Sequence, residues 1–86
     1  MRLTKIYVRH FLKPQFLYLG RGGAYFKPKY IKVFGDNVTI EDYPTLIGAS
    51  DANIQFTSWN IGKWNGQIKI GKFSLITPGV RIMAAE

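Results

Sequence analysis

The chain has 86 residues, no cysteine, one histidine and a formal net charge of +7. This length allows one domain at most, and the composition excludes a disulfide framework, a thiolate metal site and a metal centre built on several histidines. No stretch approaches the roughly 18 uncharged apolar residues of a membrane-spanning helix, and the N-terminus has no apolar run of the signal-peptide type. We therefore expect a cytoplasmic protein, with the option of a peripheral position at the inner face of the membrane.

Positive charge is concentrated in the N-terminal third of the chain. Residues 1–32 contain eight lysines and arginines and no acidic residue, whereas residues 33–86 contain four basic and five acidic residues. Such an asymmetry says more about binding partners than about the fold. We expect the N-terminal third either to face an anionic partner or to be freely solvated.

Residues 2–13 are predicted to form a short amphipathic helix that ends before Pro14. Four basic residues share one face of this helix: Arg2, Lys5, Arg9 and Lys13. Four apolar residues share the opposite face: Leu3, Tyr7, Val8 and Phe11. The basic face is either an ordinary solvated surface or a contact for a polyanion, such as an anionic bilayer or a lipid-linked sugar. In the second interpretation each lysine or arginine contributes on the order of 1 kcal/mol at an acidic surface.

The segment 14–30 is interrupted by two prolines and by the glycine-rich stretch 20–23. Its apolar stretches, 16–19 and 24–26, are predicted to be short strands or an aromatic plug that covers the end of the following structure. The glycine-rich stretch lacks the Gly-Lys-Ser/Thr ending of a phosphate-binding loop, so it is predicted to be a plain turn.

Beyond residue 30 the chain is predicted to consist of short strands and turns, and a six-residue repeat relates them. Two triplets carry this spacing: Phe34, Ile40 and Leu46, and then Ile70, Ile76 and Ile82. The period fits a β-solenoid coil with three flat sides, each of which places one large apolar residue inward. Residues 47–66 interrupt the repeat, which indicates an insertion offset by a deletion, or a loop. The alternative is an ordinary small β-sandwich or barrel in which the spacing is coincidental.

Residues 35–86 resemble the hexapeptide-repeat, or isoleucine-patch, acyltransferases. Their signature is an aliphatic residue, then Gly, Ala, Glu or Asp, two free positions, a small residue or Val, and one free position. Residues 70–75 match it throughout, 34–39 match with an aromatic first residue, 76–81 have Thr at the second position, and 40–45 depart at the fifth. The order of a basic segment, a glycine-rich turn and a Lys-Pro step is similar to a branch of this family associated with bacterial cell-surface polysaccharides.

The resemblance implies a left-handed parallel β-helix of about three coils over residues 33–86, with the basic helix and cap in residues 1–32. It implies transfer of an acetyl group from acetyl-CoA, as a co-substrate, to a sugar hydroxyl or amine, and a homotrimer with active sites between subunits. The family's catalytic base is a histidine in a segment beyond the matched region, and His10 lies in the wrong segment to replace it. We therefore predict the N-terminal part of such an enzyme, inactive alone, with no catalytic residue and no metal site of its own.

Trp59 and Trp64 flank a short polar stretch, 60–63. Tryptophans in such a setting fill a core or a subunit contact, or they stack on a sugar ring or an adenine.

Two other functions remain open. The first is a small basic β-domain that binds nucleic acid, because aromatic residues interleave with the basic ones in the N-terminal third. Against it, the charge is confined to one end of the chain. The second is a structural piece that stacks its coils on another chain. Since a short solenoid with an incompletely capped end exposes much of its core, we expect the isolated chain to oligomerise, domain-swap or aggregate.

Overall fold

The protein is built mainly from short parallel strands. A computed structural model describes residues 2–59, 63 and 65–84, with the backbone alone for residues 2 and 3. In this part of the chain nine strands form three parallel sheets of three strands each, and one short helix precedes them. The predicted all-β class is therefore confirmed.

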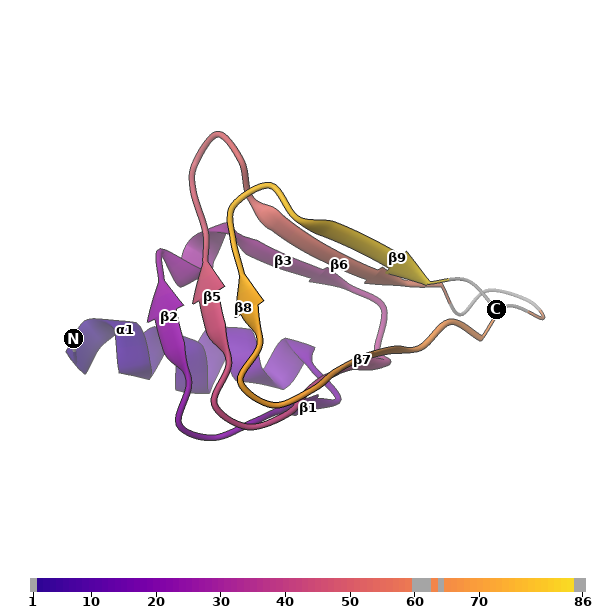
Figure 1. The fold of residues 1–86 in the computed structure, drawn as a ribbon, viewed down its shortest axis with the longest axis horizontal. Coiled ribbons are helices and arrows are strands. Elements are labelled where there is room, and N and C mark those ends of the chain that lie inside the picture. Colours follow the sequence, from indigo (N-terminus) through magenta and orange to yellow (C-terminus); the bar gives the residue numbers. More distant parts are fainter. Residues whose placement is uncertain (1, 60–62, 64, 85–86) are drawn as a thin grey trace.

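The chain visits the three sheets in turn, three times over. The sheets have the strand orders β1-β4-β7, β2-β5-β8 and β3-β6-β9, so every three consecutive strands form one circuit. The first circuit comprises β1 (Tyr18–Leu19), β2 (Ala24–Phe26) and β3 (Ile31–Phe34). The second comprises β4 (Val38–Ile40), β5 (Thr45–Ile47) and β6 (Ile54–Ser58), and the third β7 (Ile68–Ile70), β8 (Leu75–Ile76) and β9 (Arg81–Ala84). Figure 1 shows the circuits side by side, with a roughly triangular outline that we call the prism.

The isoleucines of the six-residue repeat share one interior, as predicted. Ile70 pairs with Ile40, and Ile76 pairs with Leu46 one circuit earlier. Ile40 and Leu46 are fully buried, Ile76 is 6% exposed, and Ile70 packs against the same core. Ile82, on the third sheet, also packs there. The aliphatic ladder thus runs along the inside of the prism.

Phe34 is not part of this ladder, and the prediction that it starts the upstream triplet is wrong. Successive residues of a strand point to opposite faces, and in β3 the inward positions are Ile31 and Val33. Phe34 is consequently 51% exposed. Phe34 pairs with Thr57 of the second circuit, whereas the inward Val33 pairs with Phe56, which is fully buried.

The irregular stretch 47–66 contains a regular strand between two long connections. β6 lies inside it, and its inward residues Ile54 and Phe56 are fully buried. The connections 48–53 and 59–67 are both longer than their first-circuit counterparts, 27–30 and 35–37. Two insertions therefore account for the broken repeat, with no compensating deletion.

The predicted N-terminal helix is present but changes its winding. It consists of α1 (Arg2–Tyr7), a π-helical turn (Val8–Leu12) and a 3₁₀ turn (Lys13–Gln15). Val8 and Leu12, four residues apart in the π turn, both face the core. Phe11, predicted on the apolar face, is 61% exposed, and its ring lies near the Tyr7 ring with centroids 5.3 Å apart. The side chain of Leu3 lies outside the described residues.

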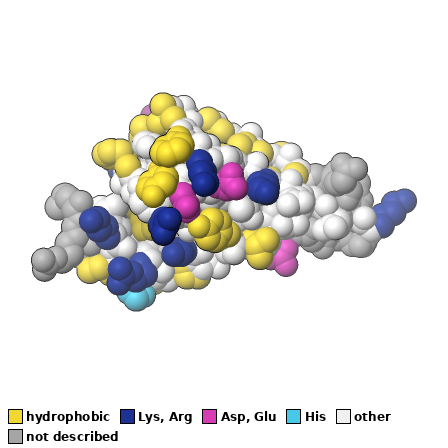
Figure 2. All heavy atoms as spheres, turned by 60° about the horizontal axis from the view of Figure 1, so that its bottom comes forward, with side chains coloured by type: hydrophobic (Ala, Val, Ile, Leu, Met, Phe, Trp, Pro, Cys, Tyr) yellow, Lys and Arg dark blue, Asp and Glu magenta, His cyan; other side chains and the backbone are white. Residues whose placement is uncertain are grey.

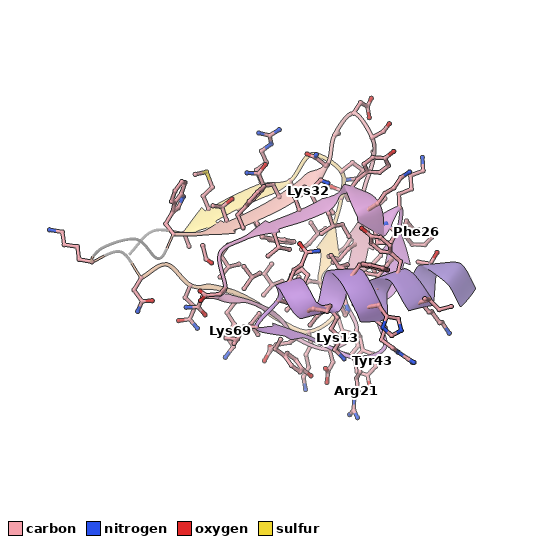
Figure 3. All side chains as sticks on the ribbon, turned by 180° about the vertical axis from the view of Figure 1, so that it is seen from behind. Lys13, Arg21, Phe26, Lys32, Tyr43 and Lys69 are labelled. Atoms are coloured by element: carbon pink, nitrogen blue, oxygen red, sulfur yellow. The ribbon has the colours of Figure 1, made fainter. Side chains whose placement is uncertain are left out.

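This helix covers one end of the prism. Val8, Leu12 and Phe16 join Leu19 and Ile31 in a single hydrophobic cluster. Seen from behind, the helix crosses in front of the strands of the first circuit (Figure 3). That circuit begins at β1, upstream of residue 33, where the sequence placed the first coil. At the other end, β7, β8 and β9 each pair on one side only within the described structure.

Candidate functional site

Three stacked turns, 20–23, 41–44 and 71–74, lie along one edge of the prism, and each connects the first sheet to the second within its circuit. Gly22, Tyr43 and Phe73 occupy equivalent places in these turns, and all have positive φ, at 71°, 62° and 59°. The N–H of Tyr43 donates to the carbonyl of Arg21 at 2.8 Å, and the N–H of Phe73 donates to that of Asp42 at 3.1 Å. The Tyr43 and Phe73 rings stack with centroids 5.2 Å apart. A methyl group at Gly22 would lie 2.6 Å from the Tyr43 ring, so the first turn requires glycine there.

A polar cluster ties the first two turns together. The hydroxyl of Tyr18 donates to Asp42 at 2.7 Å, and the backbone N–H of Arg21 donates to the same carboxylate oxygen at 3.1 Å. These two hydrogen bonds hold the pKa of Asp42 below its usual range, and the bond to Asp42 raises the pKa of Tyr18. Asp42 is therefore an ionised structural acceptor and is unsuited to act as a general base near neutral pH.

Three of the four basic residues predicted to share a helix face line one groove in the structure. Lys5, Arg9 and Lys13 are all exposed, while the side chain of Arg2 lies outside the described residues. Figure 2 shows lysines and arginines gathered at the helix end of the molecule. In Figure 3, Lys13 projects from the same side as Arg21 and Tyr43.

A groove separates this helix face from the first turn, and we call it the basic groove. Its volume is about 440 Å³. It is lined by Lys5, Val8, Arg9, Lys13, Leu19, Gly20, Gly22, Gly23 and Tyr25. One wall is therefore cationic helix and the other is glycine-rich backbone with one tyrosine.

Tyr25 gives the groove a neutral hydroxyl. Its ring packs against the hydrophobic cluster, and burial raises its pKa to about 12. A methyl group added at Gly23 would lie 2.5 Å from the Tyr25 hydroxyl oxygen. The glycine therefore makes room for the tyrosine at the rim of the groove.

A second groove lies on the outer face of the β3-β6-β9 sheet, and we call it the sheet-face groove. Its volume is about 640 Å³. It is lined by Phe34, Gly35, Asp36, Gln55, Thr57, Ser58, Trp59 and Met83. Trp59 is 40% exposed, so an aromatic ring accompanies the polar side chains. Trp64, its predicted companion, lies outside the described residues.

The described residues bring no catalytic constellation together. His10 is exposed on the π-helical turn. No three His, Cys, Asp or Glu side chains of the described ranges gather in a way that suits a metal ion. Within the same ranges, no helix has the length and apolar character needed to cross a membrane.

Comparison with protein-family models, curated proteins and solved structures yields no match to this chain.

Sequence reasoning missed both the sheet-face groove and the role of Tyr25. The groove is built from outward residues of β3 and β6, and the sequence had placed Phe34 inside the prism. The inward alternation of Ile31 and Val33 was the available signal. The six-residue spacing of Leu19, Tyr25 and Ile31 was the available signal for the inward position of Tyr25, whereas its place opposite the helix depends on the packing of two segments.

Proposed function

We propose that this chain forms the N-terminal cap and first three coils of a left-handed parallel β-helix of the hexapeptide-repeat acyltransferase family. The observation that carries the proposal is the placement of Ile70, Ile76 and Ile82 on three different sheets of one circuit, all turned to a common core. A six-residue repeat places one aliphatic residue at the same inward position on each side of a three-sided coil, and these three isoleucines follow that arrangement. An experimental structure with right-handed circuits would contradict the family assignment.

The activity proposed by this resemblance is acetyl transfer from acetyl-CoA to a sugar of a cell-surface polysaccharide, in a homotrimer. The sheet-face groove supports a sugar acceptor, because Trp59 offers a ring face beside Gln55 and Thr57. Sugar rings bind where an apolar face and hydrogen-bonding groups lie together. We assign no catalytic base to this chain, so its residues bind and position substrate while another segment supplies the base.

The proposal is tested by titrating the ¹⁵N-labelled chain with acetyl-CoA and, separately, with UDP-N-acetylglucosamine as a sugar probe. We expect saturable shifts of the Trp59 indole signal, which is identified by its loss in Trp59→Phe. Trp59→Ala should weaken binding, whereas Phe73→Ala should not, because Phe73 is also exposed but lies on the turn edge. The absence of saturable shifts with both ligands would contradict the proposal.

A second candidate is binding of single-stranded nucleic acid, favoured by the cationic wall of the basic groove. Affinity for an oligo(dT) would then fall steeply with salt, by about one phosphate contact per 0.7 of log–log slope. If the oligonucleotide is not retained at low salt, this function is ruled out.

A further inference from the structure

The cations of the basic groove are available to a ligand. Lys5, Arg9 and Lys13 are exposed, and none of them enters an ion pair within the described part of the chain. No acidic residue precedes Asp36 in the sequence. Asp42, in the turn of the second circuit, is already engaged by Tyr18 and Arg21. No acidic residue of the described ranges lines the groove, so its lining carries a net positive charge.

The opposite wall adds neutral hydrogen-bond donors. Gly20, Gly22 and Gly23 have no side chain between the backbone and a bound group. The N–H groups of Gly22 and Gly23 have no hydrogen-bond partner in the described part of the chain. Tyr25 contributes a neutral hydroxyl to the lining, and burial raises its pKa further, to about 12. Cations on one side and neutral donors on the other form a surface complementary to oxyanions.

The size of the groove and the spacing of its cations indicate which kind of anion fits. Its volume of about 440 Å³ lies within the range of roughly 300–1,000 Å³ that is typical of small-molecule sites. The three cations recur four residues apart on neighbouring turns of the helix, so they present charge along a line. An elongated group with several negative oxygens fits this arrangement better than a single carboxylate.

We propose that the basic groove binds a diphosphate group, with Lys5, Arg9 and Lys13 contacting its oxygens from one side and Tyr25 donating from the other. The same chemistry is offered by a nucleotide-linked sugar, by a lipid-linked sugar and by the diphosphate of coenzyme A. Binding of pyrophosphate and UDP is measured with no acyl donor present, so the inference can fail or hold separately from acetyl transfer.

The test measures the affinity of the chain for inorganic pyrophosphate and for UDP by isothermal titration calorimetry at low salt. The informative variant is Arg9→Gln with Lys13→Gln. Its matched control is Lys27→Gln with Lys29→Gln, which removes the same charge from a different groove beside the helix. Far-UV circular dichroism checks that both variants fold, which we expect because all four side chains are exposed.

We expect the Arg9/Lys13 variant to bind pyrophosphate at least ten-fold more weakly and the Lys27/Lys29 variant less than three-fold more weakly. Tyr25→Phe, which removes one neutral donor and no charge, should weaken binding about two- to ten-fold. Equal losses in the two double variants would indicate long-range charge alone and would overturn the proposal, as would undetectable binding of both ligands.

A sedimentation experiment with lipid vesicles distinguishes a lipid-linked from a nucleotide-linked source of the diphosphate. It also tests the simpler alternative of membrane attachment. Vesicles of phosphatidylcholine, with and without 1% of a polyprenyl diphosphate, are sedimented with the chain. Retention that requires the polyprenyl diphosphate and is competed by pyrophosphate supports a lipid-linked source, and binding of UDP without such retention supports a nucleotide-linked one. Vesicles of phosphatidylglycerol test attachment to an anionic surface. If the chain is retained on them, pyrophosphate does not compete, and neither free pyrophosphate nor UDP binds, the contact is with the membrane surface and the proposal is overturned.

Discussion

Truncation of Phe56 should cost far more stability than truncation of Phe34, although the six-residue repeat favours Phe34 as the inward residue. Phe56 is fully buried and meets Phe16 edge-to-face with ring centroids 5.9 Å apart. Removal of a buried phenylalanine side chain costs about 3–5 kcal/mol through lost transfer energy and the cavity left behind. Phe34 is 51% exposed, so Phe34→Ala should lower the free energy of unfolding by only about 1 kcal/mol.

Urea unfolding followed by far-UV circular dichroism measures both variants. Because a chain of 86 residues has a total stability of roughly 4–13 kcal/mol, Phe56→Ala alone is able to unfold it. A milder variant on the same strand keeps the comparison quantitative. Ile54→Val removes one methylene from a fully buried side chain and should cost about 0.5–1.5 kcal/mol at an unchanged slope against urea. If Phe34→Ala destabilises the chain more than Phe56→Ala does, the register of β3 against β6 is refuted.

Three further predictions concern the turns, pH and assembly. Gly35→Ala should destabilise the fold by about 2 kcal/mol or more in urea unfolding, because the φ of Gly35 is +89° and a methyl group there would collide with the Ser58 carbonyl. Gly71→Ala is the control at the same position of the six-residue signature. It should be close to neutral, because a methyl group at Gly71 would have only Glu41 near it, at 3.7 Å. Burial raises the pKa of Tyr25 from 10.0 to about 12, so the stability that depends on its neutral form is present below pH 10 and lost as pH rises toward 12. Thermal unfolding measured as a function of pH should show a smaller loss of stability in Tyr25→Phe than in the wild-type chain. Sedimentation velocity of the 86-residue chain should show association that grows with concentration, since β7, β8 and β9 each leave one edge unpaired in the described structure; a clean monomer at all concentrations would contradict this.

The inward aliphatic ladder was predictable because it depends on local periodicity. The spacing of Ile70, Ile76 and Ile82 requires only that each turn has the same length, and in the third circuit the turns do. The alternation within β3 depends instead on where the strand begins after the 3₁₀ turn Pro28–Tyr30. A one-residue error at that boundary moves Phe34 from one face to the other. Leu19, Tyr25 and Ile31 keep the six-residue spacing, whereas Ile31 and Ile40 are nine residues apart, so the register failed where the repeat was extended back across the connection between β3 and β4.

The helix shows the same division between local and tertiary information. Its position and its basic face follow from spacing, and both are present in the structure. Which apolar residue enters the core follows from packing, since Leu12 is fully buried and its neighbour Phe11 is exposed. The walls of the basic groove come from the helix and from the first turn, and no periodicity relates those two segments. Its cations could be predicted, and its glycine and tyrosine wall could not.

Because the helix both covers the core and forms the cationic wall, ligand binding and fold stability should be linked. Val8 and Leu12 anchor the helix in the core, while Arg9 and Lys13, their neighbours in sequence, face the groove. A ligand that binds only the folded chain stabilises it by about 2.7 kcal/mol when its concentration is 100 times its dissociation constant. Pyrophosphate should accordingly raise the melting temperature of the wild-type chain, with no rise for Arg9→Gln/Lys13→Gln. A rise of the same size in that variant would mean that the anion acts elsewhere, because the side chains said to bind it would then be dispensable.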